Sequence, residues 1–557
     1  MVKMTSPMAA FTYFAKSHQG DTCGTNGLPL TPHSIVILGR SQFLKSIQHE
    51  NLCEYLDIIR SKHERTIIVM EYVGKPLSEK LAVQNICYDD VLKCFYQIAC
   101  GLNHIDNLDF TMQTLEPKNV LIDELGNVKL FNYGMYYQTN QGEYVTFPIG
   151  NIRYTSPERI LGSKDNILGD IWSLGLIIAE LVFNTPLWSS LSLAQFTRKI
   201  LSLANTKNVL EKIARECNLM DKYHELNPIF RNLLESCLAV SPGERPYPNQ
   251  ILQHELFLEN IRNYRYQRPE PNECLLLQCS LKQIYYLWKL AGGDVNTELK
   301  AVGLIRNEAP ILSMPKLVLL NGQILGQPRS QSHMYDSRLV ILNLNNLKER
   351  LSRIKKQDYY PLVLTDQYGK NQYGAEMEML PIVIRERDTE YQFHRVLLFT
   401  KLLKGFPYTR DRIILESQHD IPPLLRGQIW ACLLNVMEDK SFEAIDKFTP
   451  NQTDRQIEVD IPRCHQYDEL LSSPEGHQKL KRILKAWVKA HPQYVYWQGL
   501  DSLTAPFLYL NFNNEGMCTV NIHLMHLYIQ NILRMSMLNS ILRSTPQVRD
   551  PAQNSPH

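Results

Sequence analysis

The sequence lacks the features of secreted, membrane-spanning and metal-binding chains. Its 12 cysteines are scattered from Cys23 to Cys518 without a Cys-x-x-Cys pair, which predicts reduced thiols rather than disulfides or a zinc site. The longest apolar run, residues 174–183, contains Glu180 and is far shorter than the roughly 20 residues that cross a bilayer. Residues 1–16 lack the apolar stretch of a signal peptide. We therefore expect a cytoplasmic protein without a bound metal or a transmembrane segment.

The sequence also lacks an excess of charge of either sign. Its 59 basic and 57 acidic residues give a net charge of +2, which offers no reason to expect direct binding of nucleic acid. With 44% hydrophobic and 21% charged residues, the chain has the composition of a globular protein. Its 557 residues predict more than one domain.

Short motifs in the first 260 residues follow one another in the order and spacing of protein kinases. They lie at residues 49–52, 67–72, 116–121, 132–134, 154–158, 170–175 and 242–246. The order resembles the protein kinase family and implies an α+β bilobal kinase fold over residues 10–260. In such a fold Glu158 is expected to pair with Arg245, and Asp170 to hold the backbone of the catalytic loop.

The residues that transfer phosphate in kinases are largely absent. Transfer requires a glutamate that holds the phosphate-binding lysine, an aspartate at the substrate hydroxyl, and an aspartate with an asparagine on magnesium. The first three positions are occupied by Arg40, Thr114 and Asn132, and only Asn119 is retained. Amides and hydroxyls carry no negative charge for magnesium. The domain is therefore predicted to be a pseudokinase without a cofactor, with an active ATP-dependent protein kinase as the disfavoured alternative.

The amino-terminal lobe is predicted to be degenerate as well. Lys16 is the one lysine placed to imitate the phosphate-binding lysine, and the glycines of residues 20–27 come after it. We therefore expect these glycines to form a turn rather than a phosphate-binding loop. Further on, the apolar spacing predicts a helix over residues 89–105 with Asp89 as its N-cap.

Residues 261–385 contain no recognisable catalytic motif and are interpreted as a middle segment or linker. Ser280 is placed to cap a helix over residues 281–290, and residues 339–344 have the pattern of a strand. We expect the segment to pack against its neighbours in the chain.

Residues 386–513 have helical periodicity and three ordered motifs. The first starts at Arg426, the second is Ile457-Glu-Val-Asp460-Ile-Pro-Arg463, and the third is Tyr496-Trp-Gln498-Gly499. They resemble the signatures of TBC domains, the all-α activators of Rab GTPases. A basic helix over residues 479–490 is predicted to present its lysines to solvent.

The TBC resemblance implies a catalytic role for two side chains. Arg463 is expected to be the arginine finger, Gln498 the glutamine finger, and Asp460 to orient the surroundings of the arginine. An arginine inserted beside the transferred phosphoryl group compensates its developing negative charge, and an amide can aim the attacking water. The alternative is architectural, with Arg463 paired to Asp460 and Gln498 capping a helix.

A kinase-like domain followed by a TBC domain resembles the TBC domain-containing protein kinase-like proteins. The resemblance implies a regulatory scaffold in a multi-protein complex whose TBC domain, in complete form, stimulates a Rab-family GTPase. It also implies links to growth signalling, the cytoskeleton and endosomal or vesicle trafficking. A non-catalytic docking scaffold is the alternative.

Residues 514–557 do not continue the TBC pattern and are interpreted as a divergent tail. The TBC domain is accordingly expected to be incomplete at its C-terminus, as in a truncated form. In that case the apolar side chains of Phe507, Leu508 and Leu510 would be left uncovered.

Overall fold

The computed structural model describes most of the chain and divides it into two compact units. The described residues are 7–18, 23–24, 29–83, 86–163, 166–258, 261–268, 274–305, 317–318, 324–325, 338–351, 380–434, 441–492 and 496–518. One unit comprises Met1–Ala375 with Arg387–Glu390, and the other Glu376–Glu386 with Tyr391–His557. None of the helices in the described ranges is long and apolar enough to cross a membrane.

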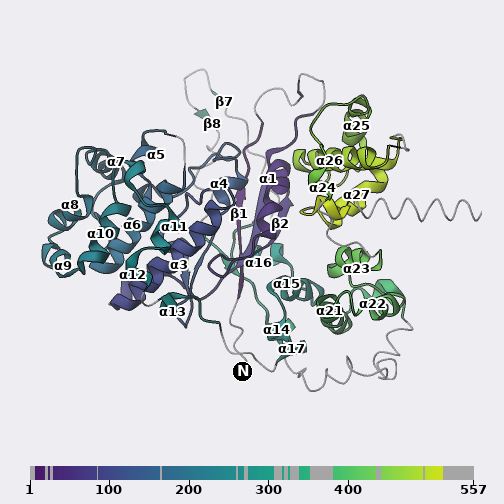
Figure 1. Ribbon diagram of the computed structural model, residues 1–557, viewed down its shortest axis with the longest axis horizontal. Helices are drawn as coiled ribbons and strands as arrows, with labels where there is room; N and C mark the ends of the chain where they lie inside the picture. The colour runs from purple at the N-terminus through teal and green to yellow at the C-terminus, as the bar shows by residue number, and fades with distance from the viewer. Residues whose placement is uncertain are drawn as a thin grey trace, which may run out of the picture. The chain divides into compact units, whose positions relative to one another are not determined.

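The first unit has the two lobes expected of a kinase fold (Figure 1). Its smaller lobe contains an antiparallel sheet of β1 (Met8–Phe14), β2 (Tyr55–Ser61) and β3 (Arg65–Glu71), with β3 between the other two. The helix α1 (His33–Ser41) packs against β2 and β3. Most residues of β1 and β3 are buried, because the sheet is covered on both faces. Of the glycine-rich residues 20–27, only Cys23 and Gly24 lie in the described ranges.

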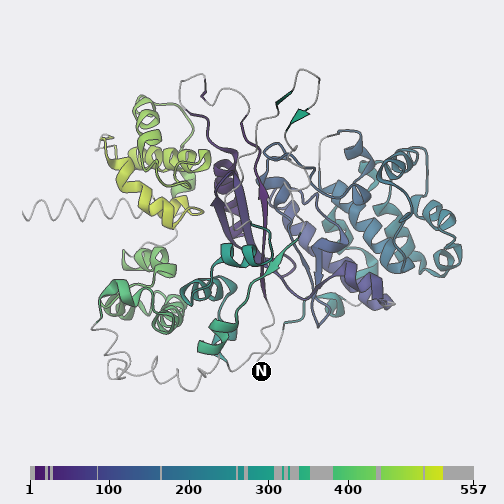
Figure 2. The same cartoon turned by 180° about the vertical axis from the view of Figure 1, so that it is seen from behind.

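The larger lobe is mainly helical and is seen from behind in Figure 2. It is built on α3 (Tyr88–Asp106) and α6 (Ile167–Phe183), which pack against each other. The other elements are β4 (Lys75–Pro76), α2 (Leu77–Val83), β5 (Val120–Ile122), β6 (Val128–Leu130), α4 (Met135–Gln138), α5 (Pro157–Ile160), α7 (Leu193–Leu201), α8 (Val209–Glu216), α9 (Met220–Glu225), α10 (Pro228–Cys237), α11 (Pro248–Leu252), α12 (Glu255–Leu258) and α13 (Ile261–Tyr264).

The structure confirms the helix predicted at residues 89–105 and corrects its start. The helix α3 begins at Tyr88, and its N-cap is Cys87, whose sulfur accepts a hydrogen bond from the backbone N–H of Asp90 at 3.4 Å. Asp89, the predicted N-cap, therefore lies inside the first turn. An acidic side chain is favourable there too, because it faces the positive end of the helix dipole.

The two architectural contacts predicted for the kinase fold are confirmed. The guanidinium of Arg245 donates to both carboxylate oxygens of Glu158, at 2.6 and 2.8 Å. The two carboxylate oxygens of Asp170, which is fully buried, accept from the backbone N–H groups of Met112 and Gln113, each at 2.8 Å. Each contact joins segments that are far apart in the sequence.

The middle segment contributes helices and short strands. They are α14 (Leu275–Gln278), α15 (Leu281–Leu290), α16 (Val295–Ala301) and α17 (Asn345–Leu351), together with the short strands β7 (Leu317–Val318), β8 (Ile324–Leu325) and β9 (Val340–Ile341). Two of the helices, α15 and α16, pack on the small lobe. Ser280 and Gln283 form a capping box on α15, as expected from the sequence. The hydroxyl of Tyr285 then donates to Asp57 of β2 at 2.9 Å.

The strand β9 enlarges the kinase-like sheet from outside the predicted kinase domain. It is shorter than the strand expected at residues 339–344, and it pairs antiparallel with β1, placing Ala10 opposite Val340. The backbone N–H of Leu342 also donates to the carbonyl of Met8 at 2.8 Å. The sheet order is thus β2-β3-β1-β9. The middle segment therefore covers part of the edge of β1 that would otherwise expose unpaired backbone groups.

The two residues of β9 provide a matched test of this contact. Val340 is 5% exposed and Ile341 is 53% exposed. A carboxylate would therefore be desolvated at position 340 and remain hydrated at position 341. Val340→Asp is expected to destabilise the sheet by about 3 kcal/mol, and Ile341→Asp by less than about 0.5 kcal/mol. The measurement is hydrogen exchange of the β1 amides in the intact chain. Equal exchange in the two variants would contradict the burial of β9 against the sheet.

The second unit is helical throughout its described residues. Its elements are α20 (Ile382–Arg385), α21 (Thr389–Lys404), α22 (Arg410–Ser417), α23 (Arg426–Leu433), α24 (Ser441–Ala444), α25 (Asp454–Asp460), the 3-10 turn η8 (Ile461–Arg463), α26 (Pro474–Ala490) and α27 (Leu500–Leu510). Buried Arg395 of α21 donates to the carboxylates of Glu416 and Asp420, each at 2.8 Å. This pairing ties α21 to α22 and to the residues that follow it.

The apolar core of this unit includes side chains that were predicted from the sequence to be exposed to solvent. Phe507 is 7% exposed and Leu508 is fully buried, so the expectation of bare apolar faces is wrong for both. Packing also continues beyond residue 513, because Cys518 is fully buried in the same core. The carboxylate of Glu515 accepts from the guanidinium of Arg482 at 2.7 and 2.9 Å. The side chains around residues 515–518 therefore belong to the packed unit.

The basic helix α26 is largely neutralised by acids of the same unit. Lys481 pairs with Glu458 at 2.5 Å, and Lys489 with Asp446 at 2.9 Å. Lys485 departs from the predicted solvent exposure, because its side chain is 2% exposed and its Nζ lies 2.7 Å from a carboxylate oxygen of Asp454. The prediction missed this because spacing alone does not reveal a buried acid on another helix.

Candidate functional site

Three of the four residues at the predicted kinase catalytic positions, Thr114, Asn119 and Asn132, lie in one hydrogen-bonded chain. The hydroxyl of Thr114 donates to the carbonyl of Asn132 at 2.9 Å, and the amide of Asn119 donates to the carbonyl of Thr114 at 2.7 Å. Thr114 and Asn132 are each 4% exposed. These side chains therefore join the catalytic-loop and Asp-Phe-Gly positions to one another.

Arg40, which stands at the fourth predicted catalytic position, has a different partner. Its guanidinium donates twice to the carbonyl of Tyr137, at 3.0 and 3.2 Å, and lies 5.0 Å from the centre of the Tyr137 ring. Next to it, the hydroxyl of Ser41 donates to the side-chain carbonyl of Gln138 at 3.0 Å. The end of α1 is thus bound to α4, the helix that follows the Asp-Phe-Gly position. In an active kinase this end of the helix would carry the glutamate for the phosphate-binding lysine.

Lys16 is not positioned as a phosphate-binding lysine. Its side chain is exposed, and its backbone N–H donates to the carbonyl of Tyr144 at 2.7 Å. The preceding residue, Ala15, forms a bridge with Val145. The end of β1 is therefore joined to the segment after α4.

The described residues of the cleft do not fit a magnesium–nucleotide complex. Asn132 occupies the position of the magnesium aspartate, and its buried side-chain oxygen has no hydrogen-bond partner among the described residues. A single neutral amide oxygen is a poor ligand for a hard dication, which binds through carboxylates and water. The nearby carboxylate of Asp170 is already bound to two backbone N–H groups.

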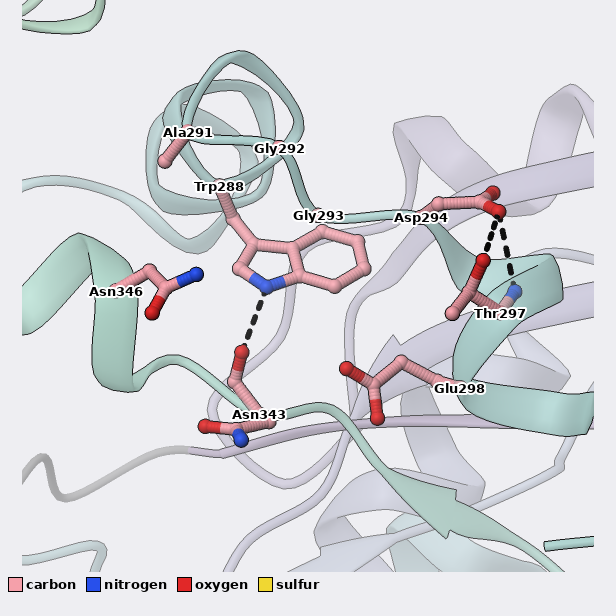
Figure 3. A pocket seen from close by; sticks show the side chains of 9 residues that line it. All are labelled: Trp288, Ala291, Gly292, Gly293, Asp294, Thr297, Glu298, Asn343 and Asn346. Atoms are coloured by element: carbon pink, nitrogen blue, oxygen red, sulfur yellow. Dashed lines mark hydrogen bonds between the residues drawn. The ribbon is translucent and has the colours of Figure 1, made fainter. Parts of the chain in front are cut away.

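A separate pocket of about 130 Å³ lies in the middle segment, and its lining is shown in Figure 3. Trp288 donates its indole N–H to the carbonyl of Asn343 at 2.8 Å. Asp294 accepts from the backbone N–H and hydroxyl of Thr297, at 3.1 and 2.7 Å. The first bond joins α15 to the residues before α17, and the second caps α16, so we interpret the pocket as a seam between packed elements.

In the second unit, the second and third TBC-like motifs meet at one buried hydrogen bond. The phenol of Tyr496 donates to a carboxylate oxygen of Asp460 at 3.1 Å, and both residues are at most 8% exposed. Burial, followed by the nearby carboxylates of Asp501 and Asp460, raises the pKa of the Tyr496 phenol. The phenol therefore keeps its proton and remains a donor. Asp460 thus joins the two motifs, and its predicted role beside the arginine stays a prediction.

Two further contacts join the same segments. A ring nitrogen of His465 lies 3.3 Å from the carbonyl oxygen of Ser502, and the sulfur of Cys464 lies 3.9 Å from the hydroxyl of Ser502. Sequence reasoning missed both contacts, because His465, Cys464 and Ser502 lie outside the recognised motifs. The loop after Arg463 is consequently attached to the first turn of α27.

The two predicted fingers lie on these joined segments and remain available. Arg463 ends η8 and Gln498 precedes α27, and both side chains are exposed. Among the residues that the structure describes, neither side chain makes a hydrogen bond or an ion pair. Neither contact of the architectural alternative is formed among the described residues. Asp460 binds Tyr496 rather than Arg463, and α27 is capped by Gly499 in a left-handed conformation without a side-chain cap.

Comparison with known proteins gives the same two domains. The profile of the protein kinase domain matches residues 35–257, and that of the Rab-GTPase-TBC domain matches residues 423–548. The TBC domain-containing protein kinase-like proteins of mouse and human are each 41% identical to the chain over 92% of its length. The chain is thus similar to these proteins through both of its domains. The Dictyostelium discoideum relative is 27% identical over 86% of the chain.

The comparisons also bear on the extent of the domains. The chain spans 62% of the length of the mouse, human and Dictyostelium relatives. The TBC match extends to residue 548, beyond residue 513 at which the sequence analysis ends the TBC pattern. Over 39% of its length, the chain is also 26% identical to human cyclin-dependent kinase-like 2. The matches thus give a kinase-like domain followed by a TBC domain in this chain.

The bond between the two TBC motifs can be tested without assuming any activity. Tyr496→Phe preserves the ring and removes the donor, leaving a buried acceptor on Asp460. We expect a loss of about 1–3 kcal/mol in local stability and faster hydrogen exchange at residues 457–463 as well as at 496–501.

The matched control is Tyr408→Phe, because Tyr408 is 97% exposed in the same unit. Faster exchange confined to residues 496–501 in the Tyr496→Phe variant would show that the bond does not hold the two motifs together.

Proposed function

We propose that the TBC domain stimulates GTP hydrolysis by a Rab-family GTPase, with Arg463 as the arginine finger and Gln498 as the glutamine finger. The observation that carries the proposal is that both side chains are exposed and unpaired among the described residues, on segments joined by the buried Asp460–Tyr496 bond. An arginine with an internal partner would have to break that contact before it could reach a phosphate. Among the residues that the structure describes, Arg463 has no internal partner of this kind.

The two side chains would have different chemical tasks. Negative charge accumulates on the transferred phosphoryl group during hydrolysis, and the planar guanidinium of Arg463 can compensate it from outside the GTPase. The amide of Gln498 can donate to the phosphate and accept from the attacking water. Both tasks require the two side chains to be held at a set distance from each other. The Asp460–Tyr496 bond supports the proposal because it joins the segments that carry them.

Substitution of the fingers tests this proposal directly. Arg463→Ala is expected to reduce the stimulated rate by about 10³-fold or more, and Arg463→Lys to be nearly as damaging, because an ammonium lacks the planar set of donors. Gln498→Ala should also slow hydrolysis. The measurement is phosphate release from a panel of GTP-loaded Rab proteins.

The matched control is Arg455→Ala, because Arg455 is also an exposed arginine, at the other end of α25. It is expected to retain the unmodified rate. A rate for Arg463→Ala equal to that of the unmodified protein would refute the catalytic role and favour the non-catalytic docking scaffold.

For the kinase-like domain we propose a pseudokinase that serves as a scaffold. Three observations support this: the neutral amide of Asn132 at the magnesium position, the cation Arg40 bound to Tyr137 at the position of the glutamate that holds the lysine, and the exposure of Lys16. The family resemblance leads us to place this scaffold in growth signalling and in endosomal and cytoskeletal trafficking, within a multi-protein complex.

ATP with magnesium is expected to leave the thermal unfolding of the protein unchanged. The physical reason is that Thr114 and Asn132 provide no anionic oxygen for the metal. The measurement is a thermal shift in ATP with magnesium, compared with ATP and a chelator. Stabilisation that disappears on chelation would contradict the pseudokinase proposal and revive the active kinase.

A further inference from the structure

Exposed apolar side chains concentrate beside the two proposed fingers. In residues 441–492 and 496–518, the large apolar side chains that remain exposed are those of Phe448, Val459, Tyr467, Trp497 and Tyr509. Three of these five lie within four residues of a finger, namely Val459, Tyr467 and Trp497. Their exposed fractions are 48%, 84% and 42%. The chain segments that carry Arg463 and Gln498 therefore also carry exposed apolar side chains.

The local structure holds the Trp497 side chain in place. Trp497 directly precedes Gln498, and its ring lies against Gly499, where an added Cβ would be only 3.1 Å from a ring carbon. Gly499 also has a φ of 106°, a conformation that disfavours any other residue. The glycine of the third motif thus leaves room for the indole ring while starting α27.

Tyr467 is held by a neighbour rather than by burial. Its hydroxyl lies 2.5 Å from the ring nitrogen Nδ1 of His465, and the two rings are 5.5 Å apart. The other ring nitrogen of His465 lies 3.3 Å from the carbonyl oxygen of Ser502. Tyr467 is therefore restrained through His465 although most of its ring faces solvent, so ordering it on binding would cost little entropy.

We propose that Trp497 and Tyr467 are the anchoring contacts for the GTP-loaded GTPase, an inference that rests on the proposed function. A GTPase whose nucleotide is reached by Arg463 and Gln498 must cover the side chains next to them in the chain. Tryptophan and tyrosine are enriched among the residues that contribute most to protein interfaces, and both are uncharged. The partner is expected to present an apolar face beside its nucleotide site.

This division of labour separates binding from chemistry. Arg463 and Gln498 act on charge that develops only during hydrolysis, so their removal lowers kcat. Trp497 and Tyr467 make contacts that are the same before and during hydrolysis, so their removal raises KM and the dissociation constant instead.

The test measures stimulated hydrolysis over a range of concentrations of GTP-loaded Rab proteins, together with their dissociation constants. Trp497→Ala is expected to raise both KM and the dissociation constant about 30-fold, and Tyr467→Ala about tenfold. In both variants kcat should stay within about twofold of the unmodified value. Trp497→Phe should recover part of the affinity. Tyr408→Ala is the matched control, because Tyr408 is an exposed aromatic residue far along the chain from the fingers.

Each outcome bears separately on the two proposals. If Trp497→Ala and Tyr467→Ala leave KM and binding unchanged while Arg463→Ala abolishes hydrolysis, the anchoring role is wrong and the catalytic role stands. If the unmodified protein binds a GTP-loaded Rab without stimulating it, and Trp497→Ala weakens that binding, the anchor stands and the catalytic proposal fails. A third outcome is that the unmodified protein binds phosphatidylcholine–phosphatidylserine vesicles but no Rab protein, and that Trp497→Ala abolishes the vesicle binding. That result would overturn both proposals and indicate a membrane contact instead.

Discussion

Buried charges that must find partners are the constraint on which both units depend. A charge removed from water is tolerated only when it is paired and hydrogen-bonded. Asp170 meets this condition with two backbone N–H groups, Arg395 with two carboxylates, and Lys485 with Asp454. Each pairing joins parts of the chain that are distant in sequence. Removing one partner of a buried pair typically costs about 3–5 kcal/mol, so these contacts specify how the elements pack.

Against this background, the availability of Arg463 and Gln498 is informative. The arginines that support the architecture, such as Arg245 and Arg395, are buried and bound, whereas Arg463 is exposed and lacks a partner among the described residues. The nearby polar groups of Asp460 and Tyr496 satisfy each other instead. The exposed arginine thus lies beside a buried hydrogen bond that joins the second and third motifs.

In the kinase-like unit, side chains at the positions of kinase catalytic residues contribute to the structure. Thr114 and Asn119 bond to backbone carbonyls within the cleft, and Arg40 bonds to the carbonyl of Tyr137. These bonds connect the segments that move relative to each other in regulated kinases. The strand β9 adds a contact from the middle segment to the same lobe. The unit is thereby suited to a scaffold that presents one arrangement of its surface.

The sequence alone determined the kinase-like and TBC folds, the degenerate positions Arg40, Thr114 and Asn132, and the motifs around Arg463 and Gln498, because each depends on residue type and local spacing. It also predicted the Arg245–Glu158 and Asp170 contacts, since these accompany the motifs. The burial of Lys485, the pairing of β9 with β1 and the burial of Phe507 and Cys518 were decided only by tertiary structure. The same holds for the Asp460–Tyr496 bond, because local periodicity carries no information about which distant segment supplies the partner.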